Sequence, residues 1–106
     1  MEKVQELRFE NQTIRLMRLD RRWWVFCADA APQIDAGLNQ EVLYTSAPER
    51  ERRIVRMKFG FFAYLVSARY LLYRLHKDET TNRNRFRAWL RAWDVVSDAA
   101  IVVDDE

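Results

Sequence analysis

Residues 7–27 read LRFENQTIRLMRLDRRWWVFC, and the pattern of this stretch sets the architecture of the chain. Apolar and polar side chains alternate on both sides of Asn11-Gln12, and Asp20-Arg21 precedes a run of aromatic and β-branched residues. A period of two is typical of strands, and short polar pairs favour tight turns. We therefore predict a three-stranded antiparallel meander with strands over about 5–10, 13–19 and 22–27.

The third of these strands is apolar on both sides. Because side chains alternate across a strand, Trp24 and Phe26 should share one face of the sheet, and Trp23 and Val25 the other. The single cysteine, Cys27, ends this run, and we interpret it as a buried, inert thiol. One cysteine excludes an internal disulfide framework and is typical of a reducing compartment.

A short helix is expected after this meander. Asp29 is a candidate amino-terminal cap, Pro32 is tolerated in an early turn, and Gly37 is a stop signal. The segment 42–44 is compatible with a short strand or with the end of a helical turn. Two short strands that meet near Gly60 are expected next, with a helix over 61–66 as the competing interpretation.

The last third of the chain has helical spacing. Ser67 is a reasonable cap for an amphipathic helix that ends near His76. A final helix, capped by Thr80 or Thr81, is expected to run to about residue 96. Its apolar face is predicted from the spacing of Phe86, Trp89, Leu90 and Trp93.

The order of strands, helix, strands and two helices predicts the α+β class, with a small antiparallel sheet and three or so helices. A chain of 106 residues corresponds to a single domain. We assign the domain to residues 1–98 and an acidic carboxyl-terminal tail to 99–106. Within that tail, 100–103 (AIVV) is compatible with an edge strand or with an apolar patch.

Charge is distributed unevenly along the chain, although the net charge is only +2. The formal charge sums to −1 over residues 1–47, to +8 over 48–91 and to −5 over 92–106. Such asymmetry indicates a polyanionic partner or a basic surface that is shielded by the acidic tail. No amino-terminal signal and no apolar run long enough to span a membrane is present, so we expect a cytoplasmic protein without a membrane partner.

Several kinds of chemistry lack the residues that they need. With one histidine and one cysteine, a histidine-rich metal site and a four-ligand zinc cluster are excluded. No glycine-rich phosphate loop is present. His76 is interpreted as a surface histidine at a helix end, and no carboxylates pair in an apolar context. We therefore expect no enzyme activity, no catalytic residues, no metal and no cofactor.

The basic residues are the strongest functional signal. The segment 50–58 (RERRIVRMK) holds four arginines and a lysine against one glutamate. Arginines also recur every four residues on the last helix, which places them in one stripe beside its apolar face. Planar guanidinium groups suit bidentate contacts with phosphate. The candidate nucleic-acid-binding residues are Arg50, Arg52, Arg53, Arg56, Lys58, Arg69, Arg83, Arg87 and Arg91.

Four segments follow one another in an order that resembles a known family. They are Phe9 with Ile14-Arg15, WVFCADAAPQI (24–34), YLVSARYLLYRL (64–75) and FRAWLRAWDVV (86–96). In this order and spacing the chain resembles the BRO amino-terminal (Bro-N) domain of phage antirepressors and baculovirus repeated-ORF proteins. It departs from the family pattern at Ser97, where a proline is usual. The resemblance implies a DNA-binding regulatory module of phage or prophage origin, and it implies no residue-level DNA site, because the shared positions are mostly apolar.

The function that we predict is that of a phage-type DNA-binding regulator related to an antirepressor amino-terminal domain, with duplex DNA as its partner. One alternative is a small phage inhibitor that docks on a host protein or a defence complex such as a CRISPR effector, with Trp23 and Tyr44 as exposed anchors. Another is a homodimeric interaction domain that pairs through residues 100–103.

Overall fold

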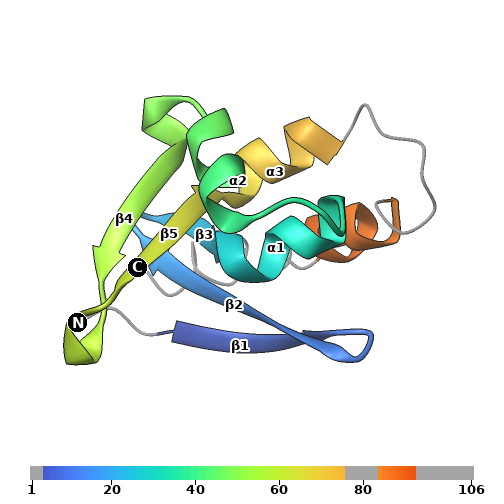
Figure 1. The fold of residues 1–106 in the computed structure, drawn as a ribbon. Helices are drawn as coiled ribbons and strands as arrows, with labels where there is room; N and C mark the ends of the chain where they lie inside the picture. The colour runs from blue at the N-terminus through green and yellow to red at the C-terminus, as the bar shows by residue number, and fades with distance from the viewer. Residues whose placement is uncertain (1–3, 76–83, 93–106) are drawn as a thin grey trace.

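The structure is a computed structural model that describes residues 4–75 and 84–92. Its strands form one antiparallel sheet in the order β1-β2-β3-β5-β4 (Figure 1). The strands are β1 (Val4–Phe9), β2 (Gln12–Leu19), β3 (Arg22–Phe26), β4 (Arg52–Arg56) and β5 (Phe62–Ser67). The helices are α1 (Cys27–Ile34), α2 (Gln40–Ser46) and α3 (Ala68–Leu75), with the short 3-10 turns η1 (Glu49–Glu51) and η2 (Lys58–Gly60). Residues 84–92 are also helical. One antiparallel sheet together with these helices confirms the predicted α+β class.

The predicted meander is present as β1, β2 and β3. Asp20 and Arg21 form the second turn, with φ angles of 52° and 63°. Two successive positive φ angles suit the right-handed twist of a two-residue hairpin. The first turn lies one residue earlier than predicted, because Glu10 takes the left-handed conformation (φ 55°) and Gln12 already belongs to β2.

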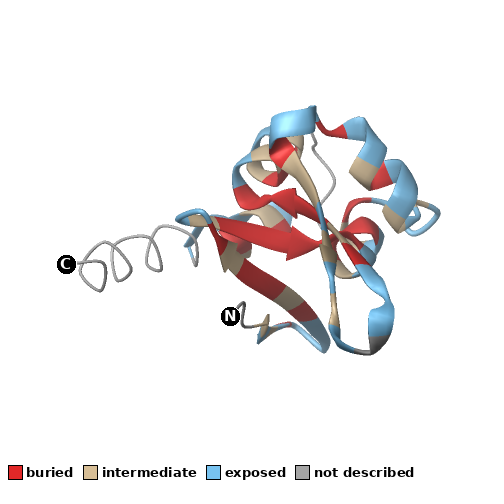
Figure 2. Ribbon diagram, turned by 90° about the vertical axis from the view of Figure 1, so that its left-hand side faces the viewer, coloured by how far each residue is buried: buried red, intermediate tan, exposed pale blue. Residues whose placement is uncertain are grey.

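The two faces of the sheet divide the aromatic residues as predicted. Trp23 and Val25 belong to the larger core, which the helices cover, whereas Trp24 and Phe26 belong to a smaller cluster on the opposite face. Figure 1 shows the helices gathered over one side of the sheet. Figure 2 shows that the sheet carries most of the buried positions, while the helices keep exposed stretches.

Arginine side chains lie over the aromatic rings of the smaller cluster. The guanidinium of Arg15 lies 4.5 Å from the centre of the Phe26 ring. Those of Arg22 and Arg53 lie 4.9 and 5.0 Å from Trp24. The apolar parts of long cationic side chains cover aromatic surface while the charged ends stay near water. This face of the sheet therefore combines an apolar base with cations.

The predicted cap of α1 is wrong. The helix begins directly after β3 at Cys27, with Phe26 at the cap position, and Asp29 lies inside its first turn. Instead of capping, the Asp29 carboxylate accepts hydrogen bonds from the Arg15 backbone N–H (2.9 Å), Nε (2.8 Å) and Nη2 (3.1 Å). The pairing of β2 with β3 ends at Leu16 and Val25, so the backbone N–H of Arg15 has no partner on β3. Asp29 accepts from that N–H instead. The helix ends at Ile34, before Gly37.

We expect Asp29→Ala to lower the free energy of unfolding by about 2 kcal/mol, because it removes hydrogen bonds to a charged group and leaves a half-buried guanidinium without its partner. Urea unfolding monitored by tryptophan fluorescence measures this loss. Glu41→Ala on the exposed first turn of α2 is the control with the same charge change. Equal losses in the two variants would contradict the role assigned to Asp29.

The remaining elements follow local signals. The segment 42–44 is helical, within α2, and the side chain of Asn39 caps that helix by accepting from the Val42 N–H. Ser67 caps α3 as predicted, since its Oγ accepts from the Tyr70 N–H at 3.0 Å. The strands β4 and β5 meet at Gly60 as predicted, and its φ of 84° favours glycine.

The helix over residues 84–92 places its apolar face on the core. Phe86 and Leu90 are buried there, and Trp89 packs at the edge. The Phe9 ring contacts both Phe86 and Trp89, with ring centres 5.2 and 5.6 Å apart. The predictions for His76, Thr80, Thr81, Trp93 and the 99–106 tail lie outside the described residues.

Candidate anion-binding site

The candidate site lies at the end of the sheet where β3 begins, β5 ends and β4 begins. Because β5 runs antiparallel to both of its neighbours, these three strand ends must meet at one end of the sheet. β3 begins with Arg22, β5 ends with Ser67, and Glu51 is the residue before β4. The topology thus brings Arg22 and Ser67 to Glu51, although they lie 29 and 16 residues away from it along the chain.

Glu51 is the centre of this site, with a side chain that is only 8% exposed. Its Oε1 accepts hydrogen bonds from Arg22 Nη2 and from Ser67 Oγ, each at 2.5 Å. Its Oε2 accepts one from Arg69 Nη2 at 2.7 Å and forms a longer ion pair with Arg50 Nε at 3.8 Å. We name Arg22, Arg50 and Arg69, together with Glu51, the arginine cluster.

The Glu51 carboxyl remains ionised at any physiological pH. Burial alone would raise its pKa, but hydrogen bonds from Arg69 and Ser67 and the charge of Arg22 outweigh burial and lower the pKa to about 2. The same hydrogen bond raises the pKa of the Arg69 guanidinium. Glu51 is therefore a fixed anion that orients arginines, and a group with so low a pKa is a poor general base.

The arginine cluster presents positive charge to solvent. Its three guanidinium groups against one carboxylate leave an excess of two positive charges within the cluster. Arg22 is one-third exposed, whereas the side chains of Arg50 and Arg69 are 85% and 72% exposed. A guanidinium has five N–H donors, so one ion pair leaves donors on Arg69 for a second anion.

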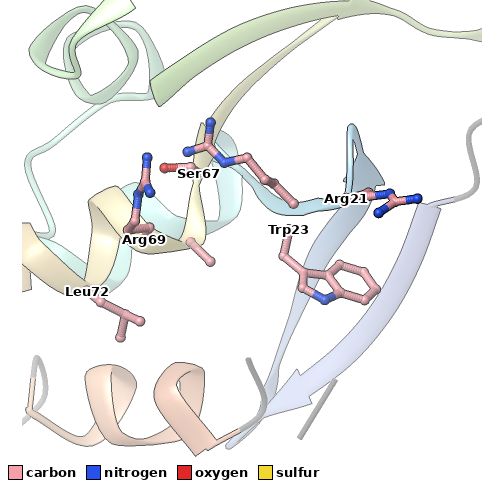
Figure 3. Close-up of a pocket in the computed structure, with 7 residues that line it drawn as sticks. Arg21, Trp23, Ser67, Arg69 and Leu72 are labelled. Atoms are coloured by element: carbon pink, nitrogen blue, oxygen red, sulfur yellow. The ribbon is translucent and has the colours of Figure 1, made fainter. Parts of the chain in front are cut away.

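Two concave surfaces flank Arg69. A pocket of about 290 Å³ lies between the β2–β3 turn and the start of α3 (Figure 3). In that view Arg21 borders the pocket from the hairpin and Arg69 from the helix, while Trp23 and Leu72 form an apolar wall. The second hollow, of about 410 Å³, is lined by Arg50, Arg69 and two tyrosines of α3. Anionic oxygens on either side could thus reach the same guanidinium.

A neighbouring hydrogen-bond network extends the basic surface toward α2. Arg74 Nη1 donates to Ser46 Oγ at 2.8 Å and to the Tyr70 hydroxyl at 3.2 Å. The Tyr70 hydroxyl in turn donates to the Ser46 carbonyl at 3.1 Å. These contacts fix α3, which carries Arg69 and Arg74, against the end of α2, and Arg69 lines the second hollow together with Arg50.

Of the predicted basic residues, the structure brings together Arg50 and Arg69. Arg52 lies close by but turns toward α2, where Nη1 donates to the Thr45 carbonyl at 3.3 Å. Arg53 lies on the face of the smaller cluster, where its guanidinium, like that of Arg22, lies over the Trp24 ring. It also pairs with Asp20 at 2.5 Å. The alternation of side chains along β4 separates these neighbours, so the 50–58 segment does not act as one surface.

The other predicted cations lie elsewhere. Arg56 and Lys58 are exposed at the far end of β4 and in η2. Arg87 is half-buried and Arg91 exposed on the helix over 84–92, and Arg83 lies outside the described residues.

The sequence interpretation missed Arg22 and Glu51, which complete the cluster, and Arg21, which borders the pocket. The available signal was Glu51 itself, a lone carboxylate among arginines in RERR, because a buried carboxylate needs cationic partners. The residues proposed as exposed anchors for a host protein are also wrong. Trp23 is 5% exposed and lies in the core, and Tyr44 is half-buried against Tyr64. The 100–103 pairing surface lies outside the described residues.

The described residues gather no set of metal-ligand side chains, and their one thiol is buried. In residues 4–75 and 84–92, no group of three His, Cys, Asp or Glu side chains is placed to hold a metal ion. Cys27 is buried, as predicted, and burial raises the pKa of its thiol to about 12. A thiol with so high a pKa is a weak nucleophile at neutral pH. No helix in the described part of the chain has the length and apolar character needed to cross a bilayer.

Comparison with protein-family models, with curated proteins and with solved structures gave no match to this chain. The resemblance to the Bro-N domain therefore stays a prediction that is carried by the four segments quoted above.

Proposed function

We propose that this chain is a DNA-binding regulatory protein, of the phage-type class that the Bro-N resemblance implies, and that its arginine cluster holds the phosphate backbone. The observation that carries the proposal is the buried Glu51, which fixes Arg22 and Arg69 in place while the guanidinium groups of Arg50 and Arg69 remain largely exposed. Preformed arginines lose less side-chain freedom when they bind a phosphate.

A polyanion fits this surface better than a small anion does. The two hollows on either side of Arg69 are open and lie next to each other, so phosphates in a row can contact Arg50, Arg69 and Arg21 in turn. Besides Arg69, the segment from Arg52 to Leu75 contains five cations and no carboxylate, which extends the positive charge beyond the cluster. Phosphate contacts of this kind position a protein on DNA without reading its sequence.

Fluorescence anisotropy with a labelled duplex tests this proposal. If three phosphates are contacted, the logarithm of the association constant should fall against the logarithm of salt with a slope of about −3, which is roughly a 40-fold loss between about 50 and 200 mM salt. A mixed-sequence duplex serves as the probe, because backbone contacts do not require an operator. Absence of binding at low salt, or binding that salt does not weaken, would overturn the proposal.

A further inference from the structure

The β4–β5 hairpin carries exposed apolar side chains that the core does not use. Phe61 and Phe62 are 55% and 59% exposed, and Ile54 on β4 is 47% exposed. The hairpin extends away from the helices, with η2 at its tip (Figure 1). β4 is an edge strand whose neighbour in the sheet is β5. Ile54 and Phe62 share one face of the hairpin, whereas the extended backbone at Phe61 (φ −91°, ψ 162°) directs that ring to the other side of the tip. Large apolar groups that are exposed indicate a binding surface.

Cations flank these phenylalanines directly. Arg56 stands opposite Phe62 in the register of β4 and β5, so the two side chains share one face of the hairpin. Lys58 is exposed in η2, three residues before Phe61. The whole hairpin, residues 52–67, has four cations and no carboxylate of its own. Its partner should therefore carry negative charge as well as flat apolar groups.

The backbone holds this tip in a defined shape. Gly60 takes a φ of 84°, and the Met57 N–H donates to the Phe61 carbonyl at 2.7 Å, which closes the turn. On the other face, Val55 and Met57 pack against the smaller core cluster and anchor the hairpin to the sheet. The exposed rings are thus presented by a fixed turn, and little ordering is needed when a partner binds.

The tip of the β4–β5 hairpin and the arginine cluster are close enough for one nucleic-acid strand to contact both. The strand β5 connects the tip to the cluster, because it runs from Phe62 at the tip to Ser67, which donates to Glu51. Five residue steps of a strand cover about 17 Å. Phosphates on one strand of DNA are spaced by about 3.4 Å along the helix axis, so about five nucleotides span this length.

We infer that Phe61 and Phe62 stack on nucleobases of the bound nucleic acid while Arg56 and Lys58 contact the adjoining phosphates. The inference rests on the proposed function, because it assigns a second contact to the same nucleic acid. Every base has an aromatic face, and alternating rings and cations are the usual means by which proteins hold unstacked bases. Because the proposed partner is duplex DNA, the bases are those of a duplex step that the two rings wedge open.

The test compares the wild type with the double variants F61L/F62L and F61W/F62W on oligonucleotides that contain 2-aminopurine, whose fluorescence responds to stacking. Leucine keeps the apolar bulk but removes the aromatic face, and tryptophan keeps it. We expect the wild type and F61W/F62W to change the fluorescence, and F61L/F62L to lose that change together with about tenfold or more in affinity. A signal on the duplex supports wedging, and a signal on single strands alone would overturn it.

The two proposals fail in different ways. If F61L/F62L binds nucleic acid with the affinity and fluorescence response of the wild type, base stacking is overturned while phosphate binding stands. If the wild type binds neither single strands nor duplex, both proposals fall. Because these side chains are exposed, circular dichroism and thermal unfolding should match the wild type, which excludes loss of folding as the cause of weaker binding.

Discussion

Replacing Glu51 with glutamine should lower the free energy of unfolding by about 3 kcal/mol at neutral pH. Glutamine has the shape of the protonated carboxyl, so the expected loss is the free energy that corresponds to a pKa lowered from 4.5 to about 2. The substitution leaves Arg22 and Arg69 without the carboxylate that orients them. Urea unfolding at pH 7 measures the loss, and Glu49→Gln on the exposed side of η1 is the control within the same turn.

The pH dependence of this difference gives an independent check. The folded pKa of Glu51 lies below its ordinary value, so the stabilisation is complete above about pH 4.5 and is lost as the pH falls toward 2. The stability of the wild type and that of E51Q should therefore converge between pH 4.5 and 2. A difference that stays constant across this range would show that the loss comes from packing rather than from the charge.

Removing the two exposed arginines of the cluster should weaken duplex DNA binding by roughly 100-fold, because each hydrogen-bonded contact to a charged group contributes about 1.5 kcal/mol or more. The variant is R50A/R69A, and anisotropy at low salt measures its affinity. Arg50 and Arg69 are largely exposed, so their loss removes less packing than a change at Arg22 would. Circular dichroism and thermal unfolding establish whether the variant is folded.

The matched control is R8A/R85A, which removes the same charge at the opposite edge of the sheet. Arg8 is exposed on β1, and Arg85 pairs with Glu10 at 3.2 Å beside the first turn. β1 and β4 are the two edge strands, about 19 Å apart at the usual strand spacing. A loss of affinity in the control equal to that in R50A/R69A would mean that net charge, and not the arginine cluster, governs binding.

Local patterns in the sequence were sufficient for most of the fold. The alternation in 7–27 predicted three strands and the division of Trp23 from Trp24, because a period of two leaves few alternatives when one face is buried. Ser67 was identified as a helix cap from its place before an apolar period. The role of Asp29 was not predictable in this way, since its partner Arg15 lies on a different strand and only the tertiary fold brings them together.

The candidate site was only partly predictable, for a physical reason. Charge density identified the 50–58 segment, but a strand sends neighbouring side chains to opposite faces, so Arg52 and Arg53 separate. The convergence of Arg22 and Arg69 on Glu51 depends on the order of β3, β5 and β4, which no local pattern specifies. The one local signal was Glu51 between Arg50 and Arg52, and its burial, which makes cationic partners necessary, is a property of the fold.

The most direct test of the claim that the arginine cluster binds phosphates is the salt dependence of duplex binding, measured in parallel for the wild type, R50A/R69A and R8A/R85A. Each phosphate contact that is lost should make the logarithmic slope less steep by about 0.9, so R50A/R69A should differ from the wild type by about 2. The slope of R8A/R85A should equal that of the wild type. Identical slopes for the wild type and R50A/R69A would contradict the account, because they would show that these arginines do not contact the backbone.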